Sequence, residues 1–269
     1  MSQIQSKKAL ITGGANGIGK LMGQSLLEKG LDTLVIWDLN KTMLEETTKD
    51  FTNLGFKVVP YVVNVMNTEQ VIATAALVKQ TVGTIDILIN NAGIIVGKHF
   101  VEHTHQDIDN TMAINASALM HIAKEFLPDM LAQDNGHIVN IASAAGMVSN
   151  PKMSVYVASK FAVVGWSDSL RLEMEDANTN VKITTVTPFY ISTGMFDGVQ
   201  SRFIPIVKPE VATRKIIYGI EHDKLYVRMP GIVYWVPLIK GLLPTKLFDL
   251  VVGKWLGMHS SMKAFKGRD

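Results

Sequence analysis

The alternation of short apolar runs with longer helical stretches constrains the fold of this sequence more than any other feature. Six runs rich in β-branched and aliphatic residues have the length and composition of buried strands. They cover residues 7–12, 31–38, 56–65, 85–93, 137–146 and 181–188, the fourth and fifth of which end in loops. The segments between them have helical periodicity, with helices ending near residues 29, 54 and 82 and longer helices at 107–130 and about 156–176. Hairpin signals are absent, so this order predicts an α/β fold with a doubly wound parallel sheet and helices on both faces.

Composition limits the classes of protein that remain. A chain of 269 residues with 47% apolar and 19% charged residues predicts one globular domain. The net charge of +2 argues against nucleic-acid binding. The absence of cysteine excludes disulfides, a thiol nucleophile and a cysteine-ligated zinc site. The seven histidines lack metal-ligand spacing, so we expect no catalytic metal.

The sequence also predicts how the domain is organised and where it resides. We expect an NAD-binding catalytic part at 1–223 and, within the same domain, a last strand and a C-terminal extension at 224–269. No apolar signal segment precedes the first predicted strand. The longest apolar run, 231–239, is about half as long as the ~20 residues that cross a bilayer. These features predict a cytoplasmic location.

A glycine-rich stretch, TGGANGIG at 12–19, follows the first predicted strand and opens a helix. Gly13, Gly17 and Gly19 leave room for the backbone to approach a pyrophosphate, and the helix N-terminus offers free N–H groups. An ordinary turn is the alternative for an isolated loop of this kind. The strand before it, the helix after it and an acid at the end of the next strand favour nucleotide binding.

That acid is Asp38, which ends the run LVIWD. A carboxylate there accepts hydrogen bonds from an adenosine ribose and repels a 2′-phosphate. Residue 16 is Asn and not a cation, so NAD is favoured over NADP as the cofactor. Lys20 and Lys41 are nearby cations that would weaken this preference, and a solvated strand-end acid is the alternative interpretation of Asp38.

The stretch SVYVASK at 154–160 places Tyr156 and Lys160 one helical turn apart. Lowering the pKa of a phenol by about three units takes roughly 4 kcal/mol. One ammonium about 4 Å away supplies about that much at an effective dielectric constant of 20. Beside a dinucleotide, such a pair could therefore transfer protons at neutral pH. Chance helical pairs of this kind are common, so the neighbouring segments decide the interpretation.

Three of those segments carry polar residues. Ser143 ends a predicted strand thirteen residues before Tyr156, and the loop between them could fold its hydroxyl back toward the phenol. NNAG at 90–93 ends another strand, beside the expected cofactor site. Asn115 lies inside the long helix, either as an ordinary buried amide or as part of a proton path.

Together these motifs, with PFYISTG at 188–194, resemble the single-domain branch of the short-chain dehydrogenase/reductase family over about residues 7–195. The resemblance implies a Rossmann-type fold and a catalytic tetrad of Asn115, Ser143, Tyr156 and Lys160. In it, Tyr156 is the acid/base, Lys160 holds the ribose and lowers the tyrosine pKa, Ser143 steadies the carbonyl and Asn115 supports a water-linked relay. The implied cofactor-binding residues are Gly13, Asn16, Gly17, Ile18, Gly19, Asp38, Asn64, Asn91, Ala92, Gly93, Tyr156, Lys160, Pro188, Ile191 and Thr193. The family usually forms homodimers or homotetramers through paired helices, here 107–130 and 156–176.

Two departures from the family pattern concern the pocket. Asn64 replaces the usual acid after the third strand, with a modest expected effect on adenine binding. Phe189 replaces the glycine of the usual Pro-Gly after the sixth strand and should make the pocket narrower and more apolar. We expect Ser143, Met153, Phe189 and Met195 to line an apolar substrate pocket, with packing beneath the loops as the alternative.

Within the family, the chain looks most similar to retinol and hydroxysteroid dehydrogenases. The predicted function is an NAD-dependent oxidoreductase that interconverts an apolar alcohol and a carbonyl by tyrosine acid/base catalysis and hydride transfer. Two alternatives remain open: a lyase or epimerase on the same scaffold, and a non-catalytic protein that senses a nucleotide.

The C-terminal segment 224–269 lies beyond the family motifs and is both basic and apolar. Its eight Lys or Arg and two Asp give a net charge of +6, so residues 1–223 carry −4. We expect its second apolar stretch to form a helix with Leu247, Phe248, Val251, Val252 and Trp255 on one face. One interpretation is a lid over the pocket or an oligomer contact. The other is a peripheral membrane contact through 231–258, with Trp235 and Trp255 near the headgroups.

Overall fold

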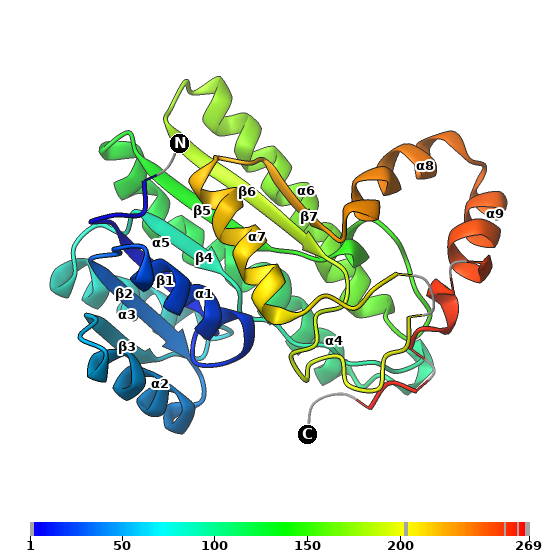
Figure 1. Ribbon diagram of the computed structural model, residues 1–269, viewed down its shortest axis with the longest axis horizontal. Helices are drawn as coiled ribbons and strands as arrows, with labels where there is room; N and C mark the ends of the chain where they lie inside the picture. Colours follow the sequence, from blue (N-terminus) through cyan, green and yellow to red (C-terminus); the bar gives the residue numbers. More distant parts are fainter. Residues whose placement is uncertain (1–2, 202–203, 256, 263, 267–269) are drawn as a thin grey trace.

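Seven parallel strands form one sheet in the order β3-β2-β1-β4-β5-β6-β7 (Figure 1). The computed structural model describes residues 3–201, 204–255, 257–262 and 264–266. The strands are β1 (Lys8–Thr12), β2 (Thr33–Asp38), β3 (Val58–Val62), β4 (Ile87–Asn90), β5 (Gly136–Ile141), β6 (Val181–Pro188) and β7 (Tyr226–Met229). The predicted Rossmann-type fold is confirmed. β7 pairs with β6, so the first strand of the C-terminal segment completes the same sheet.

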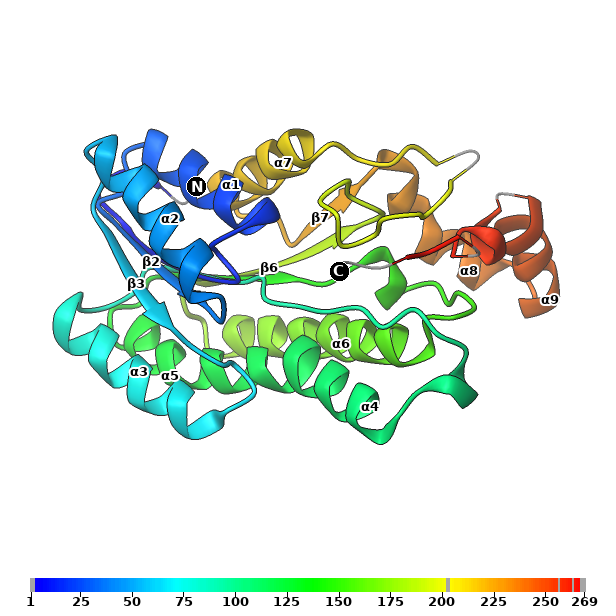
Figure 2. The ribbon, with the colours of Figure 1, turned by 90° about the horizontal axis from the view of Figure 1, so that it is seen from below.

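Helices cover both faces of the sheet, as Figure 2 shows edge-on. One layer holds α1 (Gly17–Glu28), α2 (Lys41–Asn53) and α7 (Pro209–Glu221), and the other holds α3 (Thr68–Thr81), α4 (His105–Met112), α5 (Ala118–Ala132) and α6 (Ser154–Asp176). Each layer has its own core, because the central strands are apolar on both sides. Leu34 and Ile36 of β2 pack toward the first layer, whereas Val35 and Trp37 pack toward the second.

The outer edge of the sheet at β3 contains a proline. Backbone hydrogen bonds to β2 use Lys57 O and Val63 N, so the odd-numbered residues of this strand face β2. Pro60, an even-numbered residue, turns its N–H-free nitrogen toward the open edge. A proline is tolerated there because it removes no hydrogen bond from the sheet.

The helix predicted at 107–130 contains a wider turn that the sequence pattern does not reveal. α4 and α5 are joined without a break by a π-helical segment, Ala113–Ser117. Asn115 lies in this segment and is fully buried. π-helical turns inside α-helices frequently occur at functional sites.

The part of the C-terminal segment that follows β7 projects from one end of the molecule (Figures 1 and 2). It comprises a short 3₁₀ helix (Gly231–Trp235), α8 (Val236–Leu242), α9 (Thr245–Phe248), a π-helical stretch (Asp249–Trp255) and a final 3₁₀ turn (Met258–Ser260). The predicted single apolar face is wrong in part. Phe248 and Val252 are buried, whereas Leu247 in α9 and Trp255 at the end of the π-helical stretch are 45% and 67% exposed. No helix among the described residues is long and apolar enough to span a membrane.

Candidate functional site

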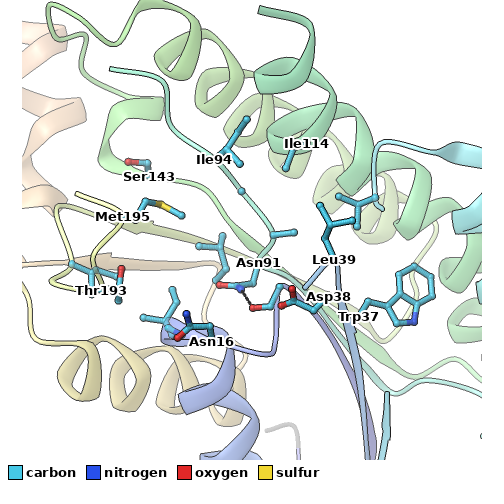
Figure 3. A pocket seen from close by; sticks show the side chains of 18 of the residues that line it. Asn16, Trp37, Asp38, Leu39, Asn91, Ile94, Ile114, Ser143, Thr193 and Met195 are labelled. Atoms are coloured by element: carbon cyan, nitrogen blue, oxygen red, sulfur yellow. Dashed lines mark hydrogen bonds between the residues drawn. The ribbon is translucent and has the colours of Figure 1, made fainter. Parts of the chain in front are cut away.

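A single cavity of about 810 Å³ opens at the carboxyl ends of β1 and β4, where the strand order reverses. Ligands of doubly wound sheets bind at this position. Figure 3 shows Asn16 and Thr193 on one side of the cavity, opposite Ile94 and Ile114. Asp38 lies at one end of the cavity, whereas Ser143 lies in another part of it (Figure 3).

The glycine-rich loop forms one wall of this cavity. Gly13 and Gly17 have positive φ angles of 62° and 56°, which side-chain-bearing residues rarely adopt. A Cβ on Gly13 would approach Ala92 Cα within 3.1 Å, whereas one on Gly17 would point toward Thr193, 3.9 Å away. Asn16 caps α1 by accepting a hydrogen bond from Gly17 N at 2.6 Å. Asn16, Gly17 and the neighbouring Ile18 line the cavity, and their contact with a cofactor stays a prediction.

Gly19, unlike Gly13 and Gly17, lies behind the cavity wall. It is buried and does not line the cavity. A Cβ at this position would come within 2.1 Å of Gly13 O and 2.8 Å of Asn91 Nδ2. Gly19 therefore allows the helix to pack closely against the loop without lining the cavity itself.

Asp38 is held at the end of β2 by two backbone donors. Its Oδ2 accepts from Ala15 N and its Oδ1 from Asn40 N, each at 3.0 Å. These bonds fix the carboxylate beside the glycine-rich loop, at the cavity wall. Lys20 pairs with Asp50 at 2.7 Å, so its ammonium is already neutralised by an acid outside the cavity lining.

The segment after β4 is tied to β1. Asn91 Nδ2 donates to Thr12 O at 3.0 Å and Gly13 O at 2.9 Å, and the Thr12 hydroxyl accepts from the backbone N–H groups of Asn91 and Ala92. These bonds place Asn91, Ala92 and Gly93 along the cavity. Asn64 also lines it, and its Oδ1 accepts from Met66 N at 3.1 Å.

Tyr156, Lys160 and Ser143 meet in the part of the cavity away from Asp38. Lys160 Nζ donates to Ile141 O at 2.9 Å and lies 5.7 Å from the centre of the Tyr156 ring. The Ser143 hydroxyl hydrogen-bonds Tyr156 and accepts from Ala145 N at 3.1 Å. The loop after β5 thus folds Ser143 back beside the phenol.

Burial moves the pKa values of the tyrosine and the lysine in opposite directions. It raises the pKa of Tyr156 to about 12, against a smaller lowering by the hydrogen bond with Ser143. Burial also lowers the pKa of Lys160 to about 8. The predicted lowering of the tyrosine pKa by Lys160 is therefore absent in the protein alone, because desolvation of the phenolate outweighs the neighbouring groups.

Asn115 does not line the cavity but braces its wall. Its Oδ1 accepts from Ile94 N at 2.8 Å, and its Nδ2 donates to Ile94 O at 2.9 Å and Ser159 Oγ at 3.1 Å. The amide therefore fixes the strand-end loop against α6. Its role in a proton relay stays a prediction.

Apolar side chains surround Tyr156. Phe189, Met195 and Phe196 line the cavity, and the Tyr156 and Phe196 rings meet edge-on at 6.2 Å. Pro188, Ile191 and Thr193 line it from the same segment after β6. Met153, predicted to contact substrate, is 2% exposed and packs beneath this lining. The alternative interpretation, packing under the loop, is correct for Met153.

A buried polar network behind the cavity was not predicted. Asn150 Nδ2 donates to Ser261 Oγ at 2.9 Å and Tyr190 OH at 3.2 Å, and Tyr190 OH and Ser261 Oγ are 2.8 Å apart. The network joins the loop before α6, the segment after β6 and the C-terminal turn. Tyr190 in PFYISTG and Asn150 before Pro151 were visible in the sequence, but no spacing indicated Ser261 as their partner.

No group of three or more His, Cys, Asp or Glu side chains suited to a metal ion occurs among the described residues.

A family model described as short chain dehydrogenase matches residues 7–202. The chain belongs to the short-chain dehydrogenase family.

Individual members of the short-chain dehydrogenase family cover nearly all of the chain. Epidermal retinol dehydrogenase 2 of Mus musculus is 36% identical over 264 residues, covering 96% of this chain and 85% of the relative. Estradiol 17-beta-dehydrogenase 11 of Pongo abelii is 34% identical over 256 residues, with 91% and 85% covered. The resemblance to retinol and hydroxysteroid dehydrogenases is confirmed, and these relatives support an oxidoreductase.

Solved short-chain dehydrogenases share the fold. One from Burkholderia phymatum, in complex with NAD, has a TM-score of 0.82 and 25% identity, covering 94% of this chain and 97% of its own. Another from Burkholderia cenocepacia J2315, in complex with NADP, has a TM-score of 0.80 and 25% identity, covering 93% and 99%. Both nucleotides therefore occur among the structural neighbours.

Proposed function

We propose that this short-chain dehydrogenase interconverts an apolar alcohol and its carbonyl compound with NAD as the hydride carrier. One observation carries the proposal: the glycine-rich loop, Asp38 and the Ser143–Tyr156–Lys160 group all line one cavity. A nucleotide held along the loop would reach the tyrosine without a change in the fold.

The residues present fit a dinucleotide. The space in front of Gly17 is open toward Thr193, and the N-terminus of α1, with no acid in its first turn, faces it. These features suit a pyrophosphate, because free N–H groups and the helix dipole favour negative charge. Asp38 would hold the adenosine ribose, and Lys160 and Thr193 would lie at the nicotinamide end.

When bound, NAD supplies a nicotinamide ring that accepts or returns a hydride at the carbinol carbon. Tyr156 takes the hydroxyl proton during oxidation and gives a proton to the carbonyl oxygen during reduction. Ser143, already hydrogen-bonded to the phenol, orients the reacting oxygen. Lys160, fixed by Ile141 O, holds its ammonium on the same side of the cavity as the phenol. This positive charge favours the phenolate when Tyr156 has lost its proton.

Electrostatics supports NAD over NADP. In the described lining, Asp38 is the acid at the adenosine end, and Lys160, the one Lys or Arg, lies next to Tyr156. A 2′-phosphate would meet the Asp38 carboxylate without an arginine or lysine of the lining to pair with it.

The lining also supports an apolar substrate. Ile94, Phe189, Met195 and Phe196 offer hydrocarbon and sulfur surface near Tyr156. Apolar lining with few polar groups is the usual form of a site for a largely apolar small molecule. Retinol-like and steroid alcohols, which the names of the relatives suggest, match this chemistry.

A panel of alcohols and carbonyl compounds, assayed by NADH absorbance, tests the proposal. We expect turnover with long-chain, isoprenoid or steroid alcohols and a higher kcat/KM with NAD than with NADP. A parallel product assay separates hydride transfer from elimination or epimerisation. Nucleotide binding without turnover of any panel member would favour the non-catalytic alternative.

A further inference from the structure

The projecting C-terminal segment exposes an unusual density of large apolar side chains. Of the 22 exposed large apolar residues among those described, eight fall within residues 231–255, the projection surface. They are Ile232, Tyr234, Trp235, Leu238, Leu242, Leu247, Leu250 and Trp255. Helix α8, with the sequence VPLIKGL, buries none of its residues. An apolar surface of this kind marks a site of association.

The composition of the projection surface indicates what covers it. Trp235 and Trp255 are 59% and 67% exposed, whereas Trp37 is buried. Exposed tryptophans beside aliphatic residues are typical of segments that lie in the headgroup region of a bilayer. Lys240, Lys246 and Lys254 accompany them in this stretch, against the single acid Asp249. The stretch therefore has a net charge of +2 beside its exposed apolar area.

Charge favours a lipid surface over a second copy of the chain. A two-fold contact brings the same surface of both subunits together. Here it would place two copies of the projection surface, each with a net charge of +2 from three lysines and one aspartate, against each other. An anionic bilayer instead offers hydrocarbon for the leucines and opposite charge for the lysines.

The inner side of the projection packs over the substrate part of the site. Phe248 and Val252 join a buried cluster with Phe189, Tyr190 and Tyr156. Lys240 Nζ also donates to Met147 O at 2.8 Å, which links α8 to the loop after β5. The projection surface and the reacting end of the cavity therefore lie on opposite sides of one apolar cluster.

We propose that residues 231–255 dock the protein on the surface of an anionic lipid bilayer, without spanning it. The exposed leucines and tryptophans enter the headgroup region, and the net positive charge of the stretch, with Lys246 exposed, adds electrostatic attraction. Docking itself depends only on this surface. Its use for collecting a lipid-dissolved alcohol rests on the proposed function.

Sedimentation of the full-length protein with vesicles tests the docking. We expect binding to phosphatidylcholine vesicles that contain phosphatidylserine, weaker binding to pure phosphatidylcholine, and partial release in high salt. The double variant Leu238→Ser/Leu242→Ser should bind at least about tenfold more weakly, because two exposed apolar contacts with lipid are lost. The matched control is Leu54→Ser/Leu77→Ser, which removes two comparably exposed leucines outside both the projection and α6.

A fluorescence measurement on the same samples gives a second test. Emission should shift to shorter wavelength on vesicle binding, and Trp235→Phe/Trp255→Phe should remove the shift. Circular dichroism and thermal unfolding verify that each variant is folded.

Three results would each overturn the proposal. The first is that the wild-type protein stays in the supernatant with vesicles at low salt, and the second is that the test and control variants lose vesicle binding equally. The third is that the test variant changes its oligomeric mass but binds vesicles as well as the wild type does. The last would assign the surface to a second copy of the chain. Because vesicle binding is measured without substrate, inactivity toward alcohols would contradict the proposed function alone.

Discussion

The Tyr156 hydroxyl, with its pKa raised to about 12, is the group on which the proposed chemistry depends. Tyr156→Phe removes the oxygen and keeps the packing of the ring against Phe196. We expect NAD to bind with nearly unchanged affinity while turnover falls by at least about 10²-fold, the scale of a lost general acid/base. Titration of NADH fluorescence and steady-state kinetics measure the two quantities. Turnover like that of the wild type in a folded variant would contradict the assigned role.

At the other end of the cavity, Asp38 should determine the choice of nucleotide. Asp38→Ser removes the carboxylate that would repel a 2′-phosphate and retains a hydroxyl for the backbone donors. We expect the preference for NAD over NADP to narrow or reverse, by about 1–3 kcal/mol in the ratio of the two kcat/KM values. A wild-type enzyme that prefers NADP would show that Asp38 does not select the cofactor.

The buried Lys160 should lower the free energy of unfolding at neutral pH, because burial lowers its pKa to about 8. The unfolded chain binds more protons than the folded one between the folded pKa of about 8 and the ordinary lysine pKa of 10.5. Stability should therefore rise with pH across that interval. Lys160→Met removes the buried charge, and we expect it to raise the free energy of unfolding at pH 7 by up to about 3 kcal/mol. Urea denaturation at pH 7 and pH 9 measures this, and the gain over wild type should shrink at the higher pH.

At the scale of elements, the C-terminal turn is fastened to the substrate side through Ser261, which is 2% exposed. Ser261→Ala removes the hydroxyl shared by Asn150 and Tyr190, so that Asn150 Nδ2 and the Tyr190 hydroxyl each lose a buried hydrogen-bond partner. We expect a loss of about 1–3 kcal/mol in the free energy of unfolding and a lower kcat/KM for bulky apolar alcohols. Ser260→Ala is the matched control, since the Ser260 hydroxyl bonds only Gly257 O at an exposed position. Equal effects of the two substitutions would contradict the fastening role.

Local motifs explain which elements were predictable. The strand–loop–helix around Gly13 and Gly17 and the turn of α6 carrying Tyr156 and Lys160 are each encoded within a few residues. The π-helical turn at Asn115 was not predictable, because apolar periodicity looks the same through α4 and α5. The placement of Met153, the direction of the Tyr156 pKa shift and the partnership of Asn150 with Ser261 depend on segments far apart in the sequence. Nothing local specifies such contacts.

At the scale of the whole molecule, we predict a homodimer or homotetramer built through α5 and α6. On α6 Phe161 is 36% and Leu172 54% exposed, and on α5 Leu131 is 37% exposed, while Leu119 and Leu170 pack inward. Apolar residues on both sides of a helix favour burial against a second partner. Light scattering at micromolar concentration should give at least twice the monomer mass, and a strict monomer would count against the prediction.

The proline at the outer edge of β3 bears on how copies of this protein can associate. With no N–H at Pro60, an incoming strand would find a gap in the ladder of donors at that edge. At the opposite edge β7 has four residues and is followed at once by Pro230. Both rims of the sheet therefore resist extension by strand addition. This protects the concentrated protein from edge-to-edge aggregation and leaves helix faces as the surfaces for assembly.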